Sequence, residues 1–257
     1  GNAVTHTSAN AALIPSCSKW NALSNWSESS LMNPEETGEY AEGDILMPPQ
    51  QSRNGMKDGT FRWDKEQFTG IRKIYTVDHE QRETIMKAIA DYHRLTCLRF
   101  VPYNGQKDYI TIQSKNTGCW SSVGRGRQEV NLQVPGCISK KGTVLHELLH
   151  AIGFMHEQSR PERDDFVTIR YNNIKPGTEN NFKKADARHT NAFGVPYDYN
   201  SVMHYSEFAF SKNSRKTIEP KVLGAALTEL GTSLSTKLIV TLRGINILVT
   251  IYSLYMP

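Results

Sequence analysis

Three histidines and a glutamate between residues 146 and 156 have the types and spacing needed to bind a metal ion. His146 and His150 are four residues apart, so on a helix their imidazoles lie one turn above each other and face one point. Zinc binds histidine nitrogens at about 2.0–2.1 Å in a near-tetrahedral array, and this pair supplies half of it. Gly153 allows the chain to reverse, so that His156 can approach from another direction. The spacing therefore predicts a zinc site.

Glu147 follows the first histidine and cannot bind the metal on that face of the helix. We expect it to project toward the fourth, water-occupied position and to act as general base when the water attacks a peptide carbonyl. The alternative is three histidines satisfied in an ordinary core. Five fixed residue types at these offsets recur by chance on the order of once in ten thousand such chains, so the motif favours zinc-dependent hydrolysis.

A helix over residues 143–152 must hold the first two histidines. Its apolar residues have helical spacing, and Gly153 stands where a C′ residue adopts a left-handed conformation. Upstream, residues 80–95 have the apolar spacing of an amphipathic helix. Short strands are predicted at residues 71–77, 97–101, 109–113 and 129–134. Beyond the glycine the chain is loop-rich, so we expect an α+β fold.

The composition excludes several classes of partner. The 257 residues are enough for one sizeable domain, and 22% charged with 38% hydrophobic residues is ordinary for a soluble globular protein. The net charge is +4 without any basic run, so we expect no nucleic-acid partner. The last stretch, residues 237–257, is apolar, but its uninterrupted run at 247–256 is too short to span a membrane, so a buried terminal helix or strand fits the stretch better.

Residues 1–53 differ in character from the rest of the chain. They are rich in Ser, Asn, Glu and Pro and lack periodicity, which predicts an extended or weakly structured leader. The first 50 residues hold six acidic residues and one lysine, a net charge of −5 that leaves +9 for the remainder. Such a leader is either a solvated tail or a segment that lies across the body and masks something.

The four cysteines allow three disulfide pairings. Cys119 and Cys137 lie in glycine-flanked loop sequence around a strand-like run, a placement that suits a disulfide in an oxidising compartment. Four free thiols in a cytosolic enzyme are the alternative. We expect the Cys119–Cys137 disulfide and a secreted protein.

The extended run over residues 146–164, His-Glu-x-x-His-x-x-Gly-x-x-His-Glu-x-x-Arg-x-x-Arg-Asp, resembles the astacin family of metzincin metallopeptidases. Residues 201–205, Ser-Val-Met-His-Tyr, look like that family's Met-turn, and the resemblance covers about residues 72–220. It implies a metzincin-like catalytic domain of the α+β class. Such a domain has a twisted, mostly parallel sheet and helices in its N-terminal half, an active-site helix, and an irregular C-terminal half.

The resemblance also implies roles for residues outside the zinc motif. Met203 would form the apolar floor beneath the zinc. Tyr205 would be a displaceable zinc ligand whose phenol stabilises the oxyanion of the tetrahedral intermediate. Glu157 would receive the buried ammonium of the mature N-terminus as a salt bridge. The rim strand on which an extended substrate pairs would comprise Cys119, Trp120 and Ser121.

The leader gains a role from the same resemblance. Family members carry a pro-segment with Phe-x-Gly-Asp, whose aspartate occupies the catalytic zinc position, and residues 41–44, Ala-Glu-Gly-Asp, look like that element without its phenylalanine. Asp44 would be the blocking ligand. Cleavage after Arg53 would free Asn54 as the new N-terminus. The expected division is a pro-segment at 1–53, a catalytic domain at 54–222 and an atypical tail at 223–257.

The C-terminus departs from the family pattern. The family's terminal cysteine pairs with the residue that matches Cys97, but Met256 stands at its apparent place and little matches from Leu223 onward. We expect Cys97 to be a free, buried thiol, with Cys17 as the other conceivable partner. A lost disulfide of this loop length would cost about 2–5 kcal/mol of stability.

These patterns together predict a secreted, monomeric endopeptidase that is made as a zymogen. It would hold one Zn²⁺ per chain and cleave protein or peptide substrates, with no nucleic-acid partner and no membrane span. Two alternatives stay open. One is a non-catalytic relative that keeps zinc for folding, although such a site needs neither Glu147 nor Tyr205. The other is an intracellular zinc hydrolase.

Overall fold

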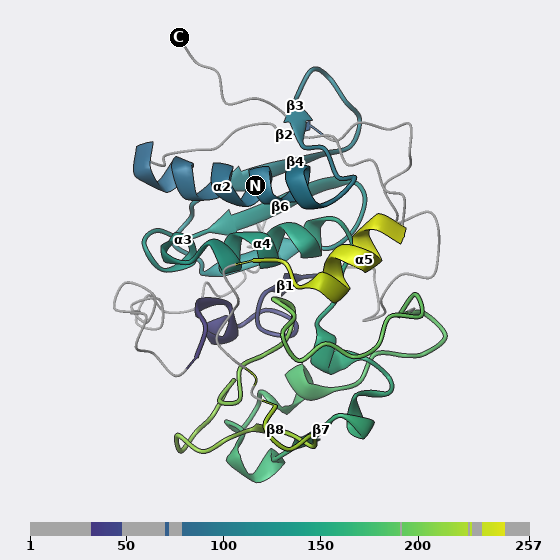
Figure 1. Ribbon diagram of the computed structural model, residues 1–257. Helices are drawn as coiled ribbons and strands as arrows, with labels where there is room; N and C mark the ends of the chain where they lie inside the picture. Colours follow the sequence, from purple (N-terminus) through teal and green to yellow (C-terminus); the bar gives the residue numbers. More distant parts are fainter. Residues whose placement is uncertain are drawn as a thin grey trace, which may run out of the picture.

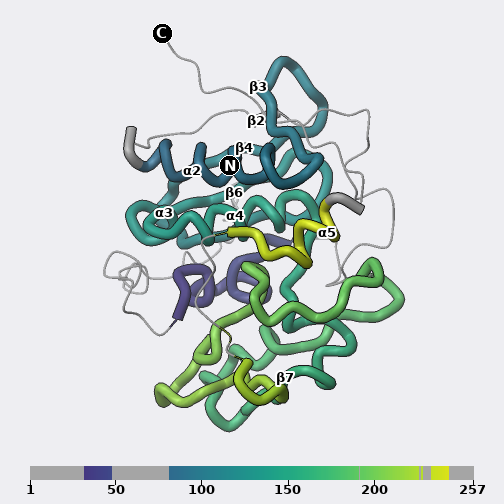
Figure 2. The backbone as a smooth tube through the Cα atoms, in the orientation of Figure 1, coloured from purple at the N-terminus to yellow at the C-terminus, as the bar shows by residue number. Residues whose placement is uncertain are grey.

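The computed structural model describes residues 32–47, 70–71, 79–190, 192–225, 227 and 233–244 (Figure 1). One half of the molecule holds a sheet and most of the helices, and the other half holds long loops and a small two-stranded sheet. The N-terminal segment, purple in Figures 1 and 2, lies between the two halves. The helix that carries His146 and His150 and the acidic leader are therefore neighbours in space.

The larger sheet has six strands in the order β1-β5-β6-β4-β2-β3. Adjacent strands in this sheet run parallel, except for the antiparallel pair β5–β6. The bounds are β1 Ile45–Leu46, β2 Gly70–Ile71, β3 Val101–Pro102, β4 Tyr109–Gln113, β5 Cys119–Ser122 and β6 Arg127–Leu132. The second sheet pairs β7 Val167–Ile169 with β8 Ile218–Pro220 in antiparallel fashion. The mostly parallel sheet of the expected α+β class is confirmed.

The α-helices lie in the same half as the large sheet (Figure 1). They are α2 His79–Leu95, α3 Gly136–Ser139, α4 Lys141–Ala151 and α5 Thr236–Gly244. Short 3₁₀ helices are η1 Pro34–Thr37, η3 Glu157–Ser159, η4 Arg163–Asp165, η5 Tyr171–Asn173 and η6 Glu179–Phe182. The predicted helices and the strand at 109–113 are confirmed, with α4 beginning two residues before its expected start.

The predicted strand at residues 97–101 is wrong, since only Val101 and Pro102 form a strand there. Thr96 ends α2 and explains the difference. Its hydroxyl donates to the carbonyl of Tyr92 (2.6 Å) and accepts from the amide of Leu98 (3.0 Å). That amide is therefore not available to a sheet. The strand expected at 129–134 lies two residues earlier, as β6, and most of the one expected at 71–77 is outside the described residues.

One apolar core joins the sheet to α2, α4 and α5. The buried phenol of Tyr92 on α2 donates to the carbonyl of Leu145 on α4 (2.6 Å), so the two helices are tied through polar as well as apolar contact. Helix α5 adds two buried leucines to this core, Leu238 and Leu242, and Leu234 just before the helix is a third. Part of the divergent C-terminal segment is therefore a buried helix. Among the described residues, no helix is long and apolar enough to cross a membrane.

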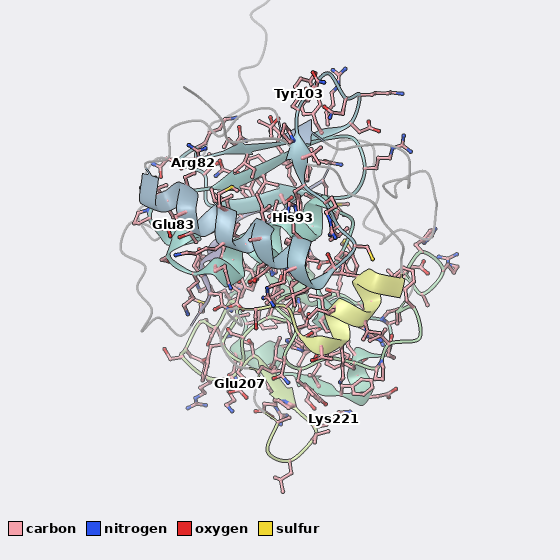
Figure 3. The ribbon with its side chains drawn as sticks, turned by 45° about the horizontal axis from the view of Figure 1, so that its top comes forward. Arg82, Glu83, His93, Tyr103, Glu207 and Lys221 are labelled. Carbon is pink, nitrogen blue, oxygen red and sulfur yellow. A yellow bond between two sulfur atoms is a disulfide. The ribbon has the colours of Figure 1, made fainter. Side chains whose placement is uncertain are left out.

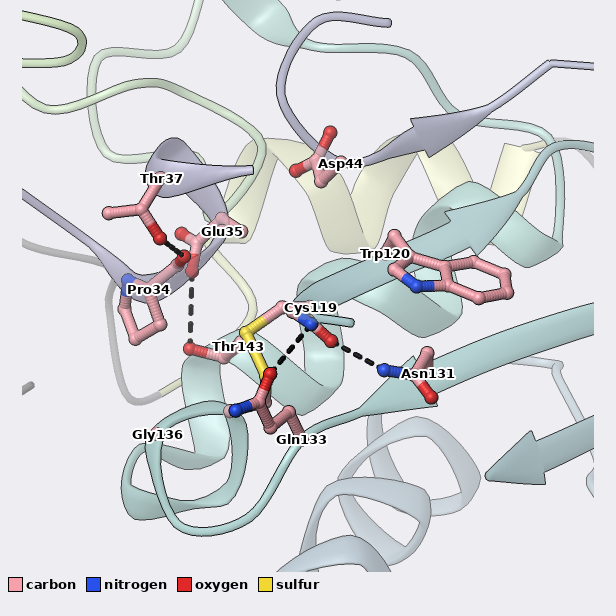
Figure 4. The surroundings of a disulfide bond; sticks show 12 residues. Pro34, Glu35, Thr37, Asp44, Cys119, Trp120, Asn131, Gln133, Gly136 and Thr143 are labelled. Atoms are coloured by element: carbon pink, nitrogen blue, oxygen red, sulfur yellow. Dashed lines mark hydrogen bonds between the residues drawn. A yellow bond between two sulfur atoms is a disulfide. The ribbon is translucent and has the colours of Figure 1, made fainter. Parts of the chain in front are cut away.

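The disulfide between Cys119 and Cys137 is confirmed, and it joins β5 to α3 with a Cα–Cα distance of 5.6 Å (Figure 4). Cys97 forms no disulfide and is exposed, so its predicted burial is wrong. Its neighbours Thr96 and Leu98 are the buried residues of this bend, which turns the intervening thiol toward solvent. Cys17, Arg53, Asn54 and Met256 lie outside the described residues.

Asp91 on α2 couples that helix to the start of α4. Its carboxylate accepts from Lys141 Nζ (2.6 Å) and from Arg94 (2.8 Å). Burial would raise the pKa of Asp91, but these hydrogen bonds and positive charges outweigh it and lower the pKa. The ion pair therefore stabilises the fold only while the carboxylate is ionised.

We predict that Asp91→Asn lowers the free energy of unfolding by about 1–2 kcal/mol at pH 7. The folded pKa lies below the unfolded value of about 3.9, so the stabilisation is complete above that value and is lost as the pH falls through the folded pKa. Urea unfolding from pH 7 to pH 3 should show the two curves converge. Glu83→Gln, which breaks an exposed pair with Lys87 on the same helix (Figure 3), is the control. A pH-independent difference would contradict the prediction.

Candidate metal centre

Helix α4 and the turn after it place all three histidines in the interior. His146 and His150 lie on α4, and both are buried together with His156. The helix ends because Gly153 adopts φ +109° and donates its amide to the carbonyl of His150 (2.8 Å). A side chain with a β-carbon is strained at this φ, so the glycine is what allows the reversal that brings His156 back.

The Nε2 atoms of the three imidazoles converge on one point. His146 Nε2 lies 3.0 Å from that of His150 and 3.2 Å from that of His156. Ligand atoms at the corners of a tetrahedron about zinc, with bonds of about 2.0–2.1 Å, are about 3.3 Å apart. The observed separations thus match the edges of a zinc coordination shell. We find that these residues fit one zinc ion.

Each of these rings has an acceptor at its other nitrogen. The Nδ1 atoms lie 2.6 Å from the carbonyl of Val202, 2.7 Å from that of Phe154 and 2.8 Å from the carboxylate of Glu42, for His146, His150 and His156 in turn. A proton on Nδ1 leaves the Nε2 lone pair free for a metal and fixes the orientation of the ring. This second set of contacts is typical of histidine metal ligands.

Asp44 completes a four-residue cluster with the histidines. Its Oδ2 lies 2.8 Å from Nε2 of His146 and 3.3 Å from that of His156, and its Oδ1 lies 3.5 Å from that of His150. Burial would raise the pKa of Asp44, but the surrounding imidazoles outweigh it and hold the pKa well below its usual range. The carboxylate is therefore positioned as a fourth metal ligand.

Strand β1 holds this carboxylate in place. The amide of Ser121 on β5 donates to the carbonyl of Asp44 (2.8 Å), and the next residue, Ile45, pairs with Ser121 in parallel register. The chain enters the strand through Glu42 and Gly43, whose φ values are +48° and +89°. A β-carbon on Gly43 would lie 2.8 Å from Cζ of Phe210, so glycine is needed for the close approach as well.

Tyr205 is hydrogen-bonded to the same leader segment. Its phenol donates to the carbonyl of Glu42, and its ring lies 4.7 Å from that of His156, centroid to centroid. Tyr205 is buried among aromatic residues that include Phe182 and Phe210. The segment therefore engages the tyrosine predicted to act in catalysis as well as the metal ligands.

Glu147 is fully buried beside the cluster, and neither of its carboxylate oxygens bonds a described residue. Burial raises the pKa of Glu147 well above its usual range, and the negative charges of Asp44 and Glu35 raise it further. Both oxygens of this buried group are therefore without a hydrogen-bond donor among the described residues.

The predicted Met-turn supports the cluster through its backbone. Val202 provides the carbonyl that orients His146, and Met203 accepts from the amide of Glu157 (2.9 Å) while its side chain is buried in the main core. The carboxylate of Glu157 accepts from Arg160 (2.7 Å) and from the amide of Asp198 (2.8 Å). Its predicted salt bridge to a new N-terminus involves Asn54, which is outside the described residues.

The predicted rim residues Cys119, Trp120 and Ser121 lie on β5, between β1 and β6. Trp120 contacts the ring of Tyr40 at 5.4 Å, so the leader covers the rim by ring contact as well as by strand pairing. The residues of the metal cluster, of the Met-turn and of the rim were all predicted from the sequence as site residues. The acidic residues of the leader other than Asp44 were given no role.

Glu35, Glu36 and Glu42 are those missed residues. Glu42 occupies the variable position of the pro-segment element, where no pattern marks it. Glu35 accepts from Thr143 of α4 at 3.4 Å (Figure 4). Glu36 belongs to a capping box with Asn33, and the run Asn-Pro-x-Glu at residues 33–36 is a helix-start pattern visible in the sequence.

Comparison with known proteins agrees with this geometry. The model of the astacin family, peptidase family M12A, matches residues 56–240. An astacin-like metalloendopeptidase of Mus musculus is 44% identical over 197 residues, which are 72% of this chain and 43% of that protein. The low choriolytic enzyme of Oryzias latipes is 40% identical over 74% of this chain and 71% of its own length. The chain thus spans less than half of the mouse relative.

A solved structure is similar as well. High choriolytic enzyme 1, a hatching enzyme zinc-protease of Oryzias latipes, superimposes with a TM-score of 0.68 and 34% identity. The match covers 75% of this chain and 98% of the fish chain. The family match extends to residue 240, well past Leu223, so the expectation that little matches beyond that leucine is wrong. The match includes Leu238 of α5, which packs on the core.

We predict that His156→Gln weakens zinc binding at least about 100-fold, because removing a ligand costs more than removing one of its hydrogen-bond partners. The full chain would be titrated against a chromogenic chelator, and its bound metal measured by mass spectrometry. His189→Gln is the matched control, since His189 is half exposed and pairs with Asp186 far from the cluster in sequence. Equal zinc affinity in both variants would refute the three-histidine site.

Proposed function

Since the chain belongs to the astacin family of zinc metallopeptidases, we propose that it is the zymogen of a secreted endopeptidase. The observation that carries the proposal is the carboxylate of Asp44 within hydrogen-bond distance of two of the three imidazoles that fit zinc. Residues 1–53 would be the pro-segment, and the catalytic domain would begin at residue 54 and extend at least to residue 240, the end of the family match. The Cys119–Cys137 disulfide supports secretion, because such bonds persist in oxidising compartments.

His146, His150 and His156 would hold zinc through their Nε2 atoms. When bound there, zinc supplies Lewis-acid chemistry that polarises a peptide carbonyl and acidifies water. Glu147 would be the general base: it would take a proton from the attacking water and pass it to the leaving amine. Its burial beside the ligands and the absence of a bond to any described residue support this role.

Tyr205 and β5 would act on the substrate. In the latent form the phenol of Tyr205 donates to the carbonyl of Glu42, and after removal of the pro-segment the same donor would be free for an oxyanion. Ser121 donates its amide to the carbonyl of Asp44, and the same amide would then pair with an extended peptide. The groups that bind the pro-segment are thus the groups that a peptide substrate needs.

Latency follows from the geometry of Asp44. It occupies the position that water and the scissile carbonyl would use, and strand β1 holds it there. Cleavage after Arg53 would sever the pro-segment from the catalytic domain and allow Asp44 to leave. The carboxylate of Glu157 would then give up part of its hydrogen bonding to Arg160 and to the amide of Asp198 and bind the new N-terminal ammonium instead.

Glu147→Gln should lower hydrolysis of casein by the trypsin-treated chain at least about 100-fold, because glutamine cannot take the proton of the attacking water. Zinc content should be unchanged, since Glu147 is not a ligand. Glu219→Gln changes an exposed carboxylate that pairs with Arg170 and serves as the control. Equal activity of Glu147→Gln and the control would rule out this mechanism.

Intact chain should be at least about 100-fold less active than trypsin-treated chain, because the tethered carboxylate competes at high effective concentration. Asp44→Ala in the intact chain should recover activity on a short fluorogenic peptide without cleavage. The activity of each form is compared at equal zinc content, with Glu39→Ala, an exposed residue of the same segment, as the control. Full activity of intact wild-type chain would defeat the zymogen proposal.

A further inference from the structure

A second carboxylate of the leader is buried against the catalytic domain, and its hydrogen-bond donors are Asn33 and Ser206, neither of which is a zinc ligand. Glu36 is 1% exposed, and its partner Ser206 is 5% exposed. Ser206 directly follows Tyr205, and it belongs to the half of the molecule opposite the large sheet. The metal-centre mechanism uses neither residue.

The contacts of Glu36 form a complete carboxylate site. Oε1 accepts from the backbone amide of Ser206 and from Asn33 Nδ2 (3.2 Å). Oε2 accepts from the hydroxyl of Ser206 (2.7 Å) and from the backbone amide of Asn33 (3.0 Å). Each oxygen therefore has one donor from the catalytic domain and one from the leader. A buried carboxylate is costly unless its oxygens are bonded in this way.

The leader preorganises Glu36 for this site. Pro34 begins η1, and the capping box between Asn33 and Glu36 fixes the side chain before it meets Ser206. The loop between Glu36 and Asp44 is also closed tightly. A β-carbon on Gly38 would lie 1.9 Å from the carbonyl oxygen of Gly43, so the two glycines touch across it. The two carboxylates are thereby held at a fixed spacing.

We propose that Ser206 forms a carboxylate-binding site of the catalytic domain, separate from zinc, whose ligand is the acidic segment 32–47 of this chain through Glu36. The inference rests on the zymogen function proposed above and makes the pro-segment a two-point inhibitor. Two linked contacts raise the affinity of the whole segment, because binding of one makes the other intramolecular. Cleavage alone then leaves the segment bound, and the second contact at Ser206 slows the departure of Asp44 from the metal centre.

The sequence allows a direct test on the full chain. No lysine or arginine lies between residues 20 and 52, so trypsin, cutting after Lys19 and Arg53, leaves Glu36 and Asp44 on one fragment. The chain is cleaved at high concentration and diluted into fluorogenic peptide. The lag before full activity then reports dissociation of the fragment, and each variant is normalised to its own final rate.

Glu36→Gln should shorten the lag about 10- to 100-fold, because the amide nitrogen that replaces one carboxylate oxygen can accept neither of the two hydrogen bonds made to that oxygen. Ser206→Ala, which removes one donor from the other side, should shorten it in the same direction and keeps the test decisive if Glu36→Gln folds poorly. Glu39→Gln, an exposed glutamate of the same segment, should leave the lag as in wild type.

The outcomes separate the two proposals. A wild-type lag in both Glu36→Gln and Ser206→Ala, with a shorter lag in Asp44→Asn, would overturn the Ser206 site and leave the zymogen intact. If Asp44→Asn also kept the wild-type lag, the zymogen function itself would fail. A shorter lag in Glu39→Gln equal to that in Glu36→Gln would mean that general acidity, and not the Ser206 site, holds the segment.

Discussion

The convergence of three imidazoles on one point is the constraint on which the rest of the structure depends. Helix α4 fixes the spacing of His146 and His150, but His156 reaches the same point only because the chain reverses at Gly153. The other ring nitrogens then recruit distant parts of the chain, namely the carbonyl of Val202 in the Met-turn and the carboxylate of Glu42 in the leader. The cluster therefore joins both halves of the molecule and the segment between them.

Charge explains why acidic side chains gather around this cluster. Asp44 and Glu147 are both fully buried, and each raises the cost of ionising the other. A zinc dication at the three Nε2 atoms would offset both negative charges at once. The imidazoles already favour the ionised form of Asp44. The positive charge that the proposed hydrolysis would need thus also favours an acidic leader at the site.

The zinc motif and its helix could be predicted from the sequence because their geometry is local: offsets of four residues and one glycine fix where the ligands point. Asp44 lies 102 residues before His146, and Tyr205 lies 49 residues after His156, so only the resemblance to a family connected them with the ligands. Glu36 and Glu42 could not be assigned, since their partners Ser206 and His156 are set by tertiary packing. The strand expected at residues 97–101 was wrong because the hydroxyl of Thr96 accepts from the amide of Leu98 and so competes with strand pairing.

The shortness of β1 makes such side-chain anchors necessary. Two residues, Ile45 and Leu46, pair with β5, and a strand of that length contributes little binding by itself. The leader is retained by side chains that bond the interior, with Asp44 at the imidazoles and Glu36 at Ser206. In the proposed zymogen, departure of these anchors would leave β6 as the one neighbour of β5 in this sheet and make β5 an edge strand. An edge with free amides is what an extended peptide can pair with, so the weakness of β1 would serve the proposed exchange of the leader for substrate.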